Sequence, residues 1–280
     1  MHRVLTEKDR DLVLSYVAAE PEMSLFIAGD IETMGMEGQL CVWGLAKAAS
    51  ADKDLGAVIL RYGDNFVVYS RDGDFDDAEA AVLIDRSMGG DAPGDVNGRA
   101  DLVARLAPFF PANRLEPCTM ASLREVNRDA VGPVPQGVEL GLLKAEEVDA
   151  WLGLQGTIDE FSLHLDDASI YAERRARKLD ELGAGLPCVV ARDDRGQIVS
   201  TASVGAASSQ GAMVIAVATD KAWRGRGLAT AVVAELCDVC LRGGLEFMSL
   251  FFENPAAARI YRRLGFCDVG PYAMLRPSAR

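Results

Sequence analysis

The sequence predicts an α/β protein with two similar halves, each containing a mixed sheet. Three observations lead to this prediction. Short apolar runs typical of strands alternate with amphipathic stretches typical of helices. The order of these segments is similar in the two halves. A segment with two prolines and two glycines, 132–137, separates them and can neither continue a helix nor lie inside a sheet. We therefore expect domains at 1–131 and 138–280, joined by a linker at 132–137.

The first half begins with helices and continues as a strand meander. Thr6 is suited to cap a helix over 7–19. Pro21 precedes a second helical stretch that carries Leu25, Phe26 and Ile31. The Gly-rich segment 89–98 is expected to be a loop. Further helices are expected at 75–84 and 101–109, and strands at 40–43, 56–60, 66–69 and 118–123.

The second half repeats this order. Its longest helix is expected to begin near Gly227 and to stop at Gly243 and Gly244, a helix C-terminal signal. Pro255 suits the first position of the last helix, which runs to 264. Two earlier helices are expected at 143–154 and 168–182, and strands at 187–192, 198–204, 213–218, 247–252 and 272–275.

Composition excludes several classes of protein. The 280 residues are 49% hydrophobic and 25% charged, as in globular proteins. No apolar run reaches the roughly 18 residues that span a bilayer, and the N-terminus lacks the apolar region of a secretory signal. We expect no membrane association and a cytoplasmic location.

The six cysteines are too few for a disulfide scaffold in a chain of this length. Cys237 and Cys240 lie three residues apart in a helical pattern, so we expect them in the core. Without a second cysteine pair or a nearby histidine, a zinc site is not expected.

The net charge of −13 argues against nucleic acid as a partner. The charge is unevenly shared, because residues 1–136 hold 13 basic and 23 acidic residues, a net charge of −10. This acidity favours a cationic or amine-bearing partner.

The most informative segment is a strand, a glycine turn and a helix start over 213–230. Gly225 and Gly227 let backbone N–H groups converge, and a helix N-terminus adds partial positive charge. Arg224 and Arg226 add formal charge, so the turn suits a pyrophosphate. The dinucleotide fingerprint G-x-G-x-x-G fails because Thr230 stands at its third glycine, and the lysine of the P-loop pattern is missing.

The remaining pattern, R-x-x-G-x-A, is formed by Arg224, Gly227 and Ala229. It resembles the coenzyme A pyrophosphate loop of the GNAT superfamily of N-acetyltransferases. A second motif lies one helix and one strand downstream and is similar to the superfamily's N-x-x-A-x-x-x-Y-x-x-x-G-F signature, here Asn254, Ala257, Tyr261, Gly265 and Phe266. The resemblance covers roughly 138–280.

The resemblance implies two GNAT-like domains, each a mixed, mostly antiparallel sheet flanked by helices. The first half has the element order of such a domain but no glycine loop. Its segment 69–77 is acidic where a phosphate loop is basic. We therefore expect a diverged domain that no longer binds the coenzyme. The same acidic run departs from the calcium-loop pattern at its sixth and twelfth positions, so a solvated turn is expected.

The family's chemistry is direct attack of a primary amine, on a small molecule or a peptide, on the thioester of acetyl-CoA. Acetyl-CoA is then the co-substrate, and no metal is implied. By this resemblance, strand backbone binds the pantetheine and the acyl carbonyl at Val217, Ala218 and Thr219. The loop holds the pyrophosphate, mostly through N–H groups, at Arg224, Gly225, Arg226, Gly227, Leu228, Ala229 and Thr230.

Tyr261 corresponds to the general acid that protonates the coenzyme sulfur. Asn254 contacts the pantetheine arm or caps the helix at Pro255. The general base stays open, since 213–219 holds no carboxylate. Glu253, Asp220 and proton transfer to solvent are the candidates.

Four further questions stay open. His164, with Glu160 and Phe161, lies between two helical stretches, where it could contact an acceptor or be an ordinary surface group. The acyl group could be propionyl or succinyl instead of acetyl. A non-catalytic acyl-CoA sensor or scaffold is the alternative function, and the oligomeric state is not readable from these patterns.

Overall fold

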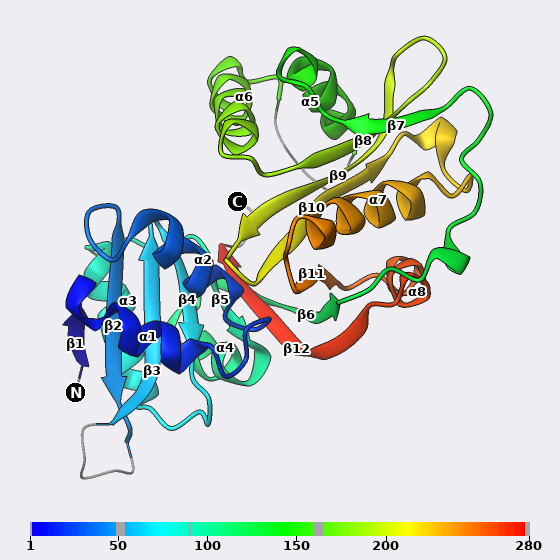
Figure 1. The fold of residues 1–280 in the computed structure, drawn as a ribbon. Helices are drawn as coiled ribbons and strands as arrows, with labels where there is room; N and C mark the ends of the chain where they lie inside the picture. Colours follow the sequence, from blue (N-terminus) through cyan, green and yellow to red (C-terminus); the bar gives the residue numbers. More distant parts are fainter. Residues whose placement is uncertain (1, 49–53, 90, 159–164, 278–280) are drawn as a thin grey trace. The chain divides into compact units, whose positions relative to one another are not determined.

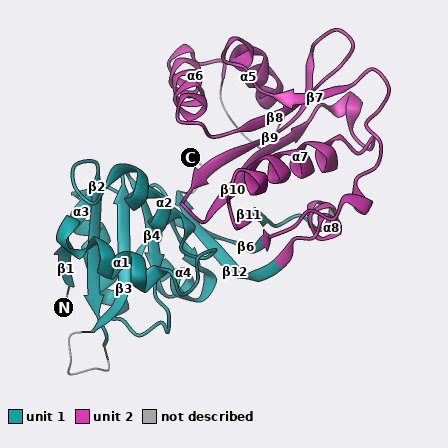
Figure 2. Cartoon of the chain, in the orientation of Figure 1, with its two compact units in different colours: residues 1–121, 251–254, 268–280 teal, residues 122–250, 255–267 magenta. Residues whose placement is uncertain are grey.

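A computed structural model describes residues 2–48, 54–89, 91–158 and 165–277. The chain forms two compact units (Figure 2). Unit 1 comprises residues 1–121, 251–254 and 268–280, and unit 2 comprises residues 122–250 and 255–267. Each unit is therefore built from more than one stretch of the chain.

Two successive series of elements follow the same order, strand-helix-helix-three strands-helix-strand-helix-strand (Figure 1). The first series is β1 (His2–Leu5), α1 (Arg10–Val17), α2 (Leu25–Met34), β2 (Leu40–Ala46), β3 (Leu55–Tyr62), β4 (Asn65–Tyr69), α3 (Asp77–Met88), β5 (Val96–Arg99), α4 (Ala100–Leu106) and β6 (Asn113–Leu123).

The second series repeats every member of the first. It is β7 (Glu139–Leu142), α5 (Val148–Gly156), α6 (Ala168–Gly183), β8 (Cys188–Arg192), β9 (Ile198–Ala207), β10 (Gly211–Thr219), α7 (Leu228–Arg242), β11 (Phe247–Phe252), α8 (Pro255–Leu264) and β12 (Cys267–Pro277). None of the described helices has the length and apolar character needed to cross a membrane.

In unit 1 the strand order is β1-β2-β3-β4-β5-β12-β6. The pairs are antiparallel from β1 to β4 and between β5 and β12, and parallel between β4 and β5. Helices α3 and α4 share one apolar core with this sheet, built around Phe66, Ile84 and Leu102. Burial of this apolar surface stabilises the unit.

In unit 2 the strand order is β11-β10-β9-β8-β7, antiparallel except for the parallel β10–β11 pair. Cys188 and Val190 of β8 pack in the core that also holds Trp151 of α5 and Leu179 of α6. The intervening residues of a strand point to the other face, and α7 contacts β8, β9 and β10. The sheet is thus covered by α5 and α6 on one side and by α7 on the other.

Strand β12 comes from the second series but lies mainly in unit 1. It pairs antiparallel with β5, from Tyr272 opposite Arg99 to Leu275 opposite Val96. Tyr272 is fully buried, and its hydroxyl is 2.8 Å from the Oδ1 of Asn97. Strand β12 therefore fills the position between β5 and β6 in the sheet of unit 1.

The expectation of a loop over 89–98 is wrong at its end, because β5 begins at Val96. The strand has only four residues and includes Gly98, so it has little β-pattern of its own. A Cβ on Gly98 would lie 2.4 Å from the carbonyl oxygen of Val68, which shows how closely β4 approaches. The short strands β1 and β7 were also not anticipated, since the sheet partner of each supplies most of its stability.

The expectation that Cys237 and Cys240 lie in the core is confirmed. All six are free thiols, and Cys237 and Cys240 are buried on α7. Burial raises the pKa of the Cys240 thiol to about 11, which keeps it protonated near neutral pH.

Candidate active site

The turn after β10 presents an exposed glycine backbone. A short 3₁₀ helix, Lys221–Trp223, is capped by Asp220, whose Oδ1 accepts the Ala222 N–H at 2.8 Å. Gly225 (φ +76°) and Gly227 (φ +80°) then adopt left-handed conformations. A Cβ at either position would meet nothing within 4 Å. The turn therefore borders open space.

This turn leads into a helix N-terminus without a side-chain cap. Gly227 is the N-cap of α7 and has no side chain that could accept from the first N–H groups. Such N–H groups and the helix dipole attract an anion. At the corresponding place in unit 1, the Oδ1 of Asp76 accepts the Glu79 N–H at 2.9 Å, so the start of α3 is already capped by a carboxylate. Of these two helix starts, that of α7 is the one that suits an external anion.

Both arginines of the turn are exposed, and each has one defined contact. The Nε of Arg224 donates to the carbonyl oxygen of Thr219 at 3.1 Å. The guanidinium of Arg226 lies 4.7 Å from the ring centroid of Trp223. These contacts keep two positive charges beside the glycine backbone.

Strand β10 contains a β-bulge. Ile215 lies opposite Ser203 and Ala218 lies opposite Thr201, so β10 advances three residues while β9 advances two. The extra residue falls beside Ala216, whose φ of +52° is the only positive φ outside glycine in the described chain. The Nε2 of Gln155 lies 3.5 Å from the carbonyl oxygen of Ala216.

The left-handed backbone of Ala216 stores strain, which a substitution can measure. An L-residue in this region costs about 1–2 kcal/mol relative to a right-handed conformation. We expect Ala216→Gly to raise the free energy of unfolding by about 0.5–1 kcal/mol in urea titrations, because glycine adopts this φ freely. Ala216→Val is the matched control and is expected to lower it. If Ala216→Gly were destabilising, the conformation would hold no strain.

Strands β10 and β11 diverge soon after they meet. Their paired residues run from Gly211 opposite Phe247 to Met213 opposite Ser249, although β10 continues to Thr219. In the described part of the chain, the Ser249 Oγ at this divergence is buried without a hydrogen-bond partner. A ligand with extended amides could add to such an unpaired strand edge.

The three strand residues expected at this edge lie beyond the bulge. Ala218 and Thr219 pair with β9, and the Ser200 hydroxyl donates to the Ala218 carbonyl at 2.9 Å and lies 2.8 Å from the Thr219 Oγ1. Val217 is part of the irregular step, since it has no register partner on β9. These contacts hold the backbone that leads into the turn.

Tyr261 lies on α8, and its ring packs edge-on against Phe266 with centroids 5.9 Å apart. Burial raises the pKa of its phenol above the ordinary value of 10.0. The group is therefore neutral throughout the physiological range and can donate a proton.

Glu253 and Asn254 belong to unit 1, whereas the turn and Tyr261 belong to unit 2. Both side chains are exposed. Burial, with a smaller contribution from the Glu253 charge, raises the pKa of the Cys118 thiol to about 12.

Asp220 lies in the turn, where it caps the 3₁₀ helix. Of the sequence-predicted groups, β10, the turn and Tyr261 all belong to unit 2. His164, Glu160 and Phe161 lie outside the described residues.

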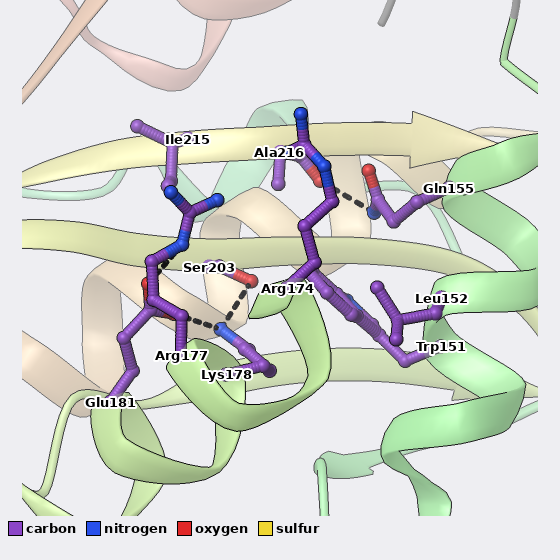
Figure 3. A pocket seen from close by; sticks show the side chains of 10 residues that line it. All are labelled: Trp151, Leu152, Gln155, Arg174, Arg177, Lys178, Glu181, Ser203, Ile215 and Ala216. Carbon is purple, nitrogen blue, oxygen red and sulfur yellow. Dashed lines mark hydrogen bonds and ion pairs between the residues drawn. The ribbon is translucent and has the colours of Figure 1, made fainter. Parts of the chain in front are cut away.

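A cavity of about 230 Å³ adjoins the bulge (Figure 3). It is lined by Trp151, Leu152, Gln155, Arg174, Arg177, Lys178, Glu181, Ser203, Ile215 and Ala216. Neighbouring residues of a regular strand point to opposite faces, but here the bulge brings Ile215 and Ala216 to the same cavity. Sequence reasoning missed this site. The available signal was the basic run on the helix at 168–182.

Lys178 is the most deeply buried charge of this lining, with 2% of its side chain exposed. Its Nζ lies 3.0 Å from the Oε2 of Glu181 and 3.2 Å from the Oγ of Ser203. The same ammonium lies 4.8 Å from the ring centroid of Trp151. A buried charge needs such partners, so this group is a fixed part of the cavity wall.

Residues 180–275 match the model of the GNAT acetyltransferase family. No curated protein matches the chain. This match covers α7, the glycine turn and Tyr261, and it ends within β12.

Solved structures share the fold of the whole chain. A tandem GNAT protein from the clavulanic acid biosynthesis pathway is 15% identical, with a TM-score of 0.61, and the match covers 98% of this chain and 97% of that one. A GCN5-related N-acetyltransferase from Sphaerobacter thermophilus is 19% identical, with a TM-score of 0.59 over 100% and 96%. One from Kribbella flavida is 21% identical, with a TM-score of 0.59 over 84% and 91%. The chain thus has the fold of two GNAT-like domains, as expected.

Proposed function

We propose that this chain, with a GNAT family match over 180–275, transfers an acetyl group from acetyl-CoA to a primary amine of a small molecule or peptide. The observation that carries the proposal is the uncapped start of α7 after two left-handed glycines. The corresponding helix of unit 1 has its own carboxylate cap, so coenzyme binding is assigned to unit 2 alone.

The residues present fit coenzyme A. The open space at Gly225 and Gly227 suits a pyrophosphate close to the backbone, flanked by Arg224 and Arg226. The N–H groups of Leu228, Ala229 and Thr230 would bind its oxygens. The unpaired edge of β10 suits the amides of pantetheine. When bound, the coenzyme supplies an activated acetyl thioester.

Three tasks then fall to the protein. Backbone at the bulge orients the acyl carbonyl, and the cavity beside Ala216 holds the amine within reach. The neutral phenol of Tyr261 donates its proton to the departing sulfur. Asp220 is engaged as a cap, and so the attacking amine loses its proton to solvent in this proposal.

Calorimetric titration with acetyl-CoA tests the proposal. We expect micromolar binding by the wild type and at least a 100-fold loss in Arg226→Glu, Gly227→Glu, because two carboxylates would then face the pyrophosphate. Arg195→Glu, Gly196→Glu is the matched control. It makes the same charge change at another Arg-Gly pair of unit 2, where the glycine is also left-handed (φ +77°) and open.

Equal binding by both double variants would place the coenzyme elsewhere. No binding by the wild type would overturn the acyltransferase proposal. If the wild type binds acetyl-CoA, a series of acetyl-, propionyl- and succinyl-CoA identifies the preferred acyl group.

A further inference from the structure

The cavity beside the bulge has an electrostatic character opposite to that of the chain. Three cationic side chains line it, Arg174, Arg177 and Lys178, with one carboxylate, Glu181. The chain as a whole has a net charge of −13. A local reversal of charge in a concave site raises the concentration of ligands of the opposite sign.

The single carboxylate is already engaged by two of the three cations. Glu181 lies 3.0 Å from the Nζ of Lys178 and 3.9 Å from the Nε of Arg177. Within the described chain, Arg174 makes no ion pair, and its buried Nε has no hydrogen-bond partner. An unpaired guanidinium that is partly withdrawn from water is costly unless a ligand pairs with it.

The direction of these groups matters as much as their charge. Figure 3 shows Arg174 and Arg177 extending from α6 toward Ala216 and Ile215 of β10. Arg175, on the same helix, is not part of the lining, and its Nε lies 2.7 Å from the Oδ1 of Asp149. The two cavity arginines thus differ from their neighbour in having a concave site before them.

We infer that this cavity selects acceptors that carry a compact anion, a carboxylate or a phosphate, together with the amine. The anion would pair with Arg174, with Arg177 at the rim, and the amine would lie at the bulge. A planar guanidinium can make two parallel hydrogen bonds to such a group. This inference rests on the proposed acyl transfer and names its substrate class. It predicts an acceptor that carries an anion, whereas the acidic composition suggested a cationic acceptor.

Matched amine pairs test it, with coenzyme thiol release as the readout. Tyrosine is compared with tyramine and phosphoethanolamine with ethanolamine, each at saturating acetyl-CoA. We expect the anionic member to have at least a tenfold higher kcat/KM in one pair, and the pair that shows it distinguishes carboxylate from phosphate. Arg174→Gln is expected to reduce that ratio at least tenfold, and the control Arg175→Gln to leave it unchanged.

A second readout does not depend on turnover. Calorimetry with the anionic amine alone should show binding to the wild type and to Arg175→Gln, and at least tenfold weaker binding to Arg174→Gln. If this binding is found but acetyl-CoA neither binds nor reacts, the anion pocket stands and the acyltransferase proposal falls. If the amines that lack the anion react as well as those that carry it, or if both arginine variants behave alike, the acyltransferase proposal stands and the pocket assignment falls.

Discussion

Tyr261→Phe is expected to lower kcat about 100-fold, in line with the roughly 10²–10⁴-fold contribution of a positioned general acid. The Kd for acetyl-CoA should change less than twofold, because the substitution removes one hydroxyl and keeps the ring that packs against Phe266. Steady-state kinetics and calorimetry on the same preparation measure the two effects.

The raised pKa of Tyr261 also predicts how kcat depends on pH. Burial raises the pKa of the Tyr261 phenol, so the proton-donating form persists above the ordinary phenol pKa of 10.0. The alkaline loss of kcat assigned to this group should therefore lie above pH 10, and it should be absent from the residual activity of Tyr261→Phe.

Tyr171→Phe is the matched control. It removes a phenol from the same unit, but that hydroxyl bonds to Asp149 at 2.7 Å and is not part of the cavity lining. An unchanged kcat in Tyr261→Phe, or an equal fall in both variants, would mean that Tyr261 only packs against Phe266.

Tyr272→Ala is expected to lower the free energy of unfolding of unit 1 by about 3–5 kcal/mol, the range for truncation of a large buried side chain. Tyr272 is fully buried in β12, which pairs with β5 on one side and adjoins β6 on the other. Urea unfolding measures the loss. Faster hydrogen exchange of the backbone amides of β3, β4 and β5 would assign it to unit 1.

Two other substitutions in β12 serve as references for the loss of stability in Tyr272→Ala. Tyr272→Phe removes only the hydrogen bond to Asn97 and should cost about 1 kcal/mol. Val269→Ala alters an exposed residue of the same strand and should stay within about 0.5 kcal/mol. If Tyr272→Ala were as mild as Val269→Ala, β12 would not hold the sheet of unit 1 together.

Sequence patterns predicted the elements whose signals are local. The glycine turn, the start of α7 at Leu228 and the start of α8 at Pro255 depend on neighbouring residues, and the structure places them as expected. Strand β5 has only four residues, and its sheet partners come from distant parts of the chain, so the expected loop at 89–98 was wrong there.

The cavity could not be predicted for a related reason. Its lining comes from α5, α6, β9 and β10, and only folding brings Trp151, Arg174 and Ser203 together. The bulge could not be predicted either, because residues 214–219 have the pattern of an ordinary strand. Its irregularity depends on the register with β9.

The place of β12 in the first sheet has a consequence for biosynthesis. The ribosome completes β1 to β6 well before it makes β12, which fills an interior position of that sheet. Until then, the nascent chain carries an unpaired strand edge at β5, and such edges favour aggregation. Translation that stops before Cys267 would still produce the glycine turn, yet its product would keep that open edge and be a substrate for chaperones and proteases.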